Sequence, residues 1–84
     1  MSSSDQEPAV RLEVDCRGLP CPTPVIRLAG AITDVAVGEV VAVAADDVAA
    51  ATDIPAWCRM RGHEYLGERP GDDGVPLHLV RRLV

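Results

Sequence analysis

The stretch DCRGLPCPTPV, residues 15–25, joins two segments that have different hydrophobic patterns. Upstream, residues 10–15 alternate between apolar and polar side chains, which predicts a half-buried strand. Downstream, apolar side chains recur at helical spacing from Val25 onward. Gly18 breaks the strand pattern, and the three prolines of the stretch exclude regular strand pairing. The stretch therefore marks the change from a strand to a helix.

The predicted helix begins between Pro22 and Pro24 and ends before Gly38. Proline is tolerated in a first helical turn because the N–H that it lacks would have no partner there. The free N–H groups and the dipole of a helix start favour a negative charge. Cys21 directly precedes this helix start, a position at which a thiol pKa falls below its free value of about 8.5. Since the thiolate is the nucleophilic form, Cys21 is the candidate catalytic residue.

Neighbouring residues are candidates for supporting this thiol. Pro22 and Pro24 restrict φ at two positions and stiffen the turn. Gly18 lets the chain turn, and Arg17 adds a positive charge close in sequence. Arg17 and Arg27 flank the motif, and the simpler interpretation is that both are solvated charges. The more specific interpretation is that they dock an acidic partner surface.

The second strand and the second helical region follow from similar patterns. Residues 40–45 form a short apolar run that predicts a covered strand. Asp46 or Asp47 is expected to cap the helical segment that follows. Pro55 is expected to interrupt this segment, with Asp53 as the N-cap of a fresh helix that ends at Gly62.

The end of the chain carries two more predicted strands, residues 64–69 and 76–82, joined by the turn-rich loop PGDDG. Arg81 and Arg82 are interpreted as edge charges that discourage strand pairing between molecules. The expected element order is β-α-β-α-β-β. This order predicts an α+β fold, a two-layer α/β sandwich in which two helices pack on one face of a four-stranded mixed sheet.

Composition limits the class of protein. The 84 residues suit one domain, with residues 1–9 as a disordered N-terminal tail and residues 10–84 as the domain. Phe is absent, so we expect an aliphatic core that also takes in Trp57 and Cys58. A net charge of −5 argues against direct nucleic-acid binding. With no signal-peptide pattern and no apolar run near the ~18 residues of a membrane span, the expected location is the cytoplasm.

The chain shows no Ser-His-Asp arrangement, no Gly-rich phosphate loop and no paired catalytic carboxylates. A reactive thiol without separate acid–base residues suits a carrier that accepts a group from one protein and passes it to another. A metal or redox site built from Cys16, Cys21 and a histidine is a rival interpretation, but it lacks the ligand spacing of zinc sites. We therefore expect neither a metal nor a cofactor.

In addition to these local patterns, the sequence resembles the TusA/SirA family of small sulfur-carrier proteins. The resemblance covers about residues 11–82, almost the whole chain. The matching motifs, in chain order, are Asp-x-x-Gly-Leu-x at residues 15–20, Cys-Pro-x-Pro at 21–24, VGE at 37–39, the Asp pair at 46–47, DIPAWC at 53–58 and GHE at 62–64.

This resemblance implies the same β-α-β-α-β-β sandwich, and it implies that Cys21 carries sulfane sulfur as a persulfide. The implied partners are a sulfur donor, either a cysteine desulfurase or a rhodanese-type protein, and an acceptor in a sulfur relay. The relay serves tRNA thiolation, cofactor synthesis or sulfur metabolism, and the sequence does not select among them. A monomer is the simpler expectation, because Cys21 must reach two partners in turn. The alternative function is a regulatory protein-binding module that uses the same surface without sulfur chemistry.

Cys16, five residues before Cys21, has two open interpretations. As a second thiol it would resolve a persulfide by forming a Cys16–Cys21 disulfide. Otherwise it is an inert, buried thiol at the end of the first strand.

Overall fold

The computed structural model describes residues 9–20 and 22–84. Its elements are, in order, β1 (Val10–Asp15), α1 (Thr23–Ala31), the short 3-10 helix η2 (Ile32–Asp34), β2 (Val40–Ala44), α2 (Ala50–Arg61), β3 (Glu64–Pro70) and β4 (Pro76–Arg81). The element order predicted from the sequence is confirmed. Residues 1–8, which make up most of the expected tail, and Cys21 lie outside the described residues.

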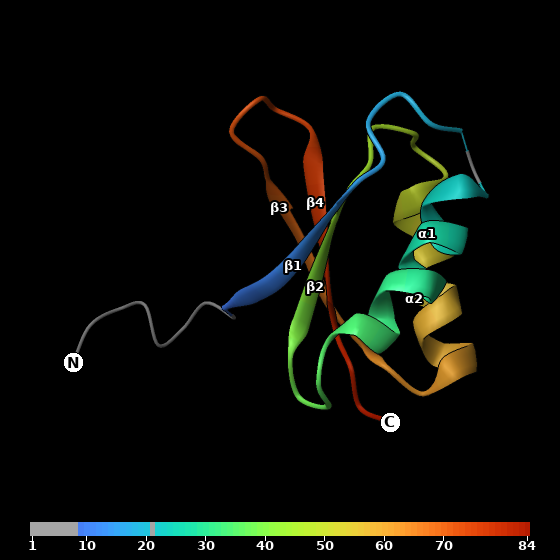
Figure 1. Ribbon diagram of the computed structural model, residues 1–84. Helices are drawn as coiled ribbons and strands as arrows, with labels where there is room; N and C mark the ends of the chain where they lie inside the picture. Colours follow the sequence, from blue (N-terminus) through green and yellow to red (C-terminus); the bar gives the residue numbers. More distant parts are fainter. Residues whose placement is uncertain (1–8, 21) are drawn as a thin grey trace.

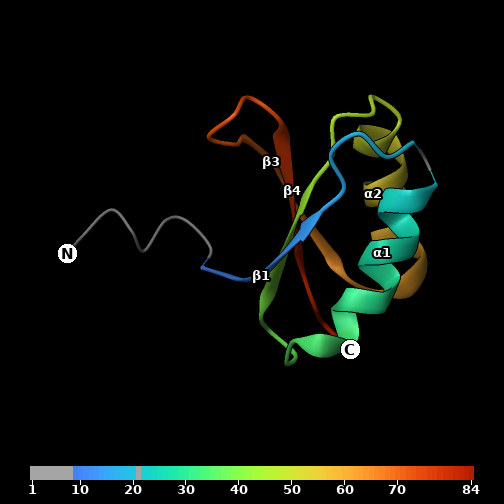
Figure 2. The ribbon, with the colours of Figure 1, turned by 45° about the horizontal axis from the view of Figure 1, so that its top comes forward.

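The four strands form one mixed sheet in the order β1-β2-β4-β3. The first pair, β1 and β2, is parallel, whereas β4 runs antiparallel to both β2 and β3. Helices α1 and α2 lie side by side on the same face of this sheet in both views (Figures 1 and 2). The predicted two-layer sandwich with two helices on one face is therefore confirmed.

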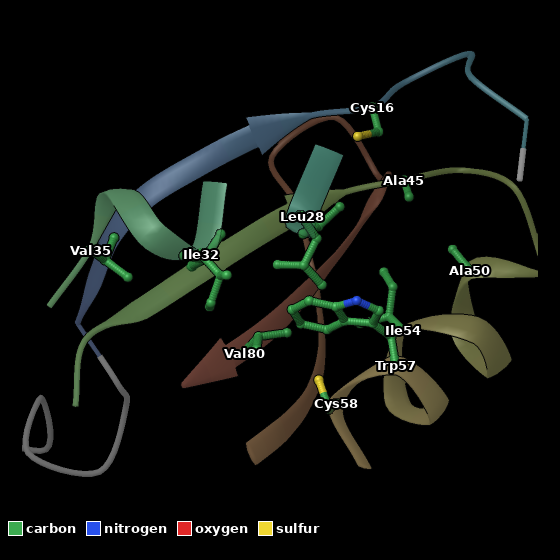
Figure 3. Packing of buried hydrophobic residues seen from close by; sticks show 12 residues of the cluster. Cys16, Leu28, Ile32, Val35, Ala45, Ala50, Ile54, Trp57, Cys58 and Val80 are labelled. Atoms are coloured by element: carbon green, nitrogen blue, oxygen red, sulfur yellow. The ribbon is translucent and has the colours of Figure 1, made fainter. Parts of the chain in front are cut away.

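The core between the helices and the sheet is built mainly from small aliphatic side chains. All five residues of β2 are buried, as expected for a strand inside the sheet with helices over one face. Trp57 of α2 points into this core between Ile54 and Val80 (Figure 3), and its side chain is only 7% exposed. The cluster comprises Cys16, Leu28, Ile32, Val35, Val41, Val43, Ala45, Ala50, Ile54, Trp57, Cys58 and Val80. The prediction that Trp57 and Cys58 belong to the core is confirmed.

Helix α2 contradicts the expected break at Pro55. It runs without interruption from Ala50 to Arg61, with Pro55 inside it and Asp53 in its first turn rather than at a new N-cap. The missing N–H of Pro55 removes one hydrogen bond near the helix start. The buried side chains of Ile54 and Trp57 hold the segment on the sheet, so tertiary packing outweighs this local loss. The helix ends at a left-handed Gly62, φ +80°, as the sequence predicts.

The interpretation of Arg81 and Arg82 as edge charges is wrong, because β4 pairs with a strand on each side. The edges of the sheet are β1 and β3. Arg81 Nη1 lies 3.2 Å from Glu64 Oε1 on β3, and Arg82 Nη1 donates to the Val35 carbonyl at 2.6 Å. The second bond ties the end of β4 to the segment that follows η2. Strand position within a sheet depends on tertiary pairing, which the charge pattern of a single strand does not report.

A buried histidine on β4 pairs with a tyrosine on β3. His78 on β4 is 2% exposed, and its Nδ1 lies 3.0 Å from the hydroxyl of Tyr65 on β3. Burial lowers the pKa of His78, and the Glu68 carboxylate opposes this effect. The folded protein therefore favours the neutral imidazole.

We expect the protein to lose stability as the pH falls below about 6.5, the pKa of an unfolded histidine. Below that pH, His78 binds a proton more readily in the unfolded chain than in the folded chain, where its pKa is lower. Protonation therefore stabilises the unfolded state relative to the folded state. Urea unfolding at pH 7.5 and pH 5.5 measures the difference. His78→Gln serves as the control, since it removes this titration and should weaken the pH dependence. An equal slope in both proteins would contradict the assignment to His78.

Candidate functional site

The motif loop, residues 16–22, connects the end of β1 to the start of α1, and the structure describes residues 16–20 and 22 of it. Its first residue is fixed to the sheet, because the Cys16 N–H donates to the Ala44 carbonyl of β2 at 2.8 Å. The Leu19 N–H then donates to the Cys16 carbonyl at 3.1 Å, which closes a turn. Gly18 occupies this turn with φ +75°, a conformation that favours glycine. This accounts for the glycine of the sequence motif.

The helix start after the loop lacks a side-chain cap. Pro22 is the N-cap residue, Pro24 lies in the first turn and is buried, and α1 carries no acidic residue in that turn. The Thr23 N–H donates to the Pro20 carbonyl at 2.9 Å. The predicted helix start between Pro22 and Pro24 is confirmed. The position of Cys21, between exposed Pro20 and exposed Pro22 in the sequence, lies outside the described residues.

The charge of Arg17 is directed to carboxylates of the same molecule. Its Nε lies 2.6 Å from Asp73 on the β3–β4 loop, and its Nη1 lies 3.0 Å from Asp15. A longer contact of 3.8 Å joins it to Glu13. The Val75 N–H and, to a smaller extent, Arg17 lower the pKa of Asp73. In this arrangement Arg17 links the motif loop to the far hairpin, rather than presenting an uncompensated charge to a partner.

Asp46 was predicted as a possible cap of the second helix, but in the structure it binds the motif loop. Its two carboxylate oxygens accept the Gly18 N–H at 3.0 and 3.2 Å. The predicted cap of α2 by Asp46 or Asp47 is wrong, because Ala49 is the N-cap residue and no side chain caps this helix. The Asp47 Oδ1 accepts the Ala49 N–H at 2.8 Å in the turn that precedes α2. The sequence alone offers no signal for the Asp46–Gly18 contact, because 28 residues separate the two.

The two described cysteines are buried and reduced. Cys16 is 0% exposed and Cys58 is 1% exposed. Burial raises the pKa of Cys16, and it raises the pKa of Cys58 to about 11. Figure 3 shows the two sulfurs in different parts of the core, Cys16 at the end of β1 and Cys58 on α2. Both thiols are therefore poor nucleophiles at neutral pH, and Cys16 matches the buried-thiol interpretation.

Within residues 9–20 and 22–84, no group of three or more His, Cys, Asp or Glu side chains is placed to hold a metal ion. In the same part of the chain no helix has the length and apolarity that crossing a membrane requires.

Comparison with known proteins identifies first the class of fold and then the family. A crystal structure of a SirA-like protein from Desulfitobacterium hafniense matches with a TM-score of 0.73 over 87% of this chain and 99% of that chain, at 24% identity. The family model described as "Sulfurtransferase TusA" matches residues 12–82. The sulfur carrier protein TusA of Pseudomonas syringae pv. syringae is 34% identical over 82 residues, 98% of this chain and 96% of the relative. That of Pseudomonas entomophila is 38% identical over 69 residues, 82% of this chain and 85% of the relative. The chain belongs to the TusA family.

Proposed function

We propose that the protein is a sulfur carrier that holds sulfane sulfur as a persulfide on Cys21. The observation that carries this proposal is the start of α1 at Thr23, two residues after Cys21 in the sequence. This helix end has no side-chain cap and no carboxylate in its first turn, so its partial positive charge is available to an adjacent thiolate. The family membership supports the same role, because relatives of this chain are named as sulfur carriers.

The loading step is a thiol exchange in which atoms and charges balance. The Cys21 thiolate attacks the outer sulfur of a donor persulfide, forms a new S–S bond and releases the donor thiolate. In the unloading step, an acceptor thiolate attacks the outer sulfur of the Cys21 persulfide and regenerates the Cys21 thiolate. Neither step requires a metal or an oxidant.

The expected partners are proteins that deliver and accept such sulfur. A cysteine desulfurase or a rhodanese-type protein would serve as donor, and an acceptor thiol in a sulfur relay would continue to tRNA thiolation, cofactor synthesis or sulfur metabolism. We place this exchange in the cytoplasm. The exposed prolines on both sides of Cys21 leave the loop accessible for the two encounters.

A loading assay tests the proposal. The purified, reduced protein is incubated with a cysteine desulfurase and cysteine, or with a rhodanese and thiosulfate, and its intact mass is measured. We expect the gain of one sulfur atom, which dithiothreitol reverses. No gain with either donor would argue for the alternative, a regulatory binding module. That module would tolerate Cys21→Ala in a cell that depends on the protein, whereas a carrier would not.

A further inference from the structure

Asp46 anchors the motif loop from a different part of the chain. Its carboxylate binds the Gly18 N–H with both oxygens, and Gly18 lies three residues before Cys21. We propose that Asp46 is a positioning residue that fixes the Cys21 thiol at the start of α1. This inference rests on the proposed role of Cys21 and names a residue on which its reactivity depends.

The composition of the loop explains why this one hydrogen bond matters. Pro20 and Pro22 have no N–H, so the backbone on both sides of Cys21 has few donors with which to hold its position. The Leu19 N–H is used within the loop, on the Cys16 carbonyl. Among the described backbone N–H groups of the loop before Cys21, that of Gly18 is the last to bind another segment. Gly18 and Leu19 also share a shallow surface hollow with Asp46, beside the β2–α2 connection.

The charge of Asp46 indicates that its effect is geometric. A carboxylate near a thiol disfavours the thiolate, so charge alone would make Asp46 harmful to a nucleophilic cysteine. The hydrogen bond that Asp46 accepts from Gly18 would instead favour the thiolate, because it would hold the loop in the position where the start of α1 stabilises the Cys21 thiolate. The two effects are separable, since an asparagine removes the charge but keeps a carbonyl oxygen that accepts the Gly18 N–H.

The experiment measures the rate at which iodoacetamide alkylates Cys21 as a function of pH, with the modified peptide identified by mass. Cys16 and Cys58 are buried and give little background. Asp46→Ala and Asp46→Asn lose the same charge, so their difference reports the hydrogen bond. We expect Asp46→Ala to react at pH 7 at least about fivefold more slowly than Asp46→Asn, which corresponds to a rise of about 0.7 in a thiol pKa that lies above 7. Asp46→Asn should match or exceed the native rate.

Two further variants control for the possibility that Asp46→Ala reacts slowly only because it is misfolded. Asp46→Glu keeps the native charge but moves the oxygens by one methylene group, so it should react more slowly than the native protein. Asp47→Ala removes an equal charge at the next residue together with the turn hydrogen bond to the Ala49 N–H, and its Cys21 rate should stay within about twofold of native. Circular dichroism confirms the fold of each protein.

Equal alkylation rates for Asp46→Ala and Asp46→Asn, or an equal loss in Asp47→Ala, would overturn the positioning role. The readout uses a small reagent, so it does not depend on persulfide chemistry. If Asp46→Ala is alkylated more slowly than Asp46→Asn but the native protein takes up no sulfur, the carrier function is refuted and the positioning role of Asp46 is retained. Where loading does occur, the rate of persulfide transfer to an acceptor thiol should fall in the same order, with Asp46→Ala slowest.

Discussion

Replacement of Cys21 by serine is expected to abolish sulfur loading, with a loss of at least about 100-fold in the rate of persulfide formation. A serine hydroxyl does not ionise near neutral pH and does not form a stable persulfide. Cys16 and Cys58 cannot replace the missing thiol, because both lie in the core and burial raises the pKa of each. Mass spectrometry after incubation with a desulfurase and cysteine measures the remaining loading.

The matched controls for this prediction are Cys16→Ser and Cys58→Ser. Each removes one thiol from the chain, and each should still gain one sulfur on Cys21. Cys16→Ser also tests whether Cys16 resolves the persulfide. If release of the sulfur required a Cys16–Cys21 disulfide, the persulfide form of this variant would accumulate. Loading of the Cys21→Ser protein at the native rate would place the carrier site elsewhere in the chain.

The second large effect is expected in the core, where Ile54→Ala should lower the free energy of unfolding by about 2–5 kcal/mol. Ile54 is fully buried on α2, beside Trp57, and its truncation leaves a cavity between helix and sheet. A domain of 84 residues has a total stability of roughly 4–13 kcal/mol, at about 0.05–0.15 kcal/mol per residue. The substitution therefore removes a large fraction of the total.

Met60→Ala is the control for this substitution, because it lies on the same helix and truncates a side chain that is 77% exposed. Its unfolding free energy should change by less than about 0.5 kcal/mol. Urea denaturation followed by the fluorescence of Trp57, the only tryptophan, measures both proteins. Because alanine is the best helix former, neither variant should lose stability through helix propensity. Comparable losses in the two variants would therefore contradict the assignment of the Ile54 effect to core packing.

The sequence by itself determined the order and kind of the elements. The alternation of residues 10–15, the helical spacing after Pro24 and the glycine at position 62 are local signals, and the structure follows all three. These signals are readable because side-chain periodicity and backbone conformation act over a few residues. The strand-to-helix junction that carries Cys21 was predictable for the same reason.

Only the tertiary structure decided which distant groups meet. The continuity of α2 through Pro55 depends on the burial of Ile54 and Trp57 against the sheet. The central place of β4 depends on two strand pairings, and neither is encoded in its own six residues. The hydrogen bond from Gly18 to Asp46 joins residues 28 apart, and the Arg17 contact with Asp73 joins the motif loop to the last hairpin. Such contacts form only when the folded backbone brings separate segments together, so they cannot be predicted from local sequence patterns.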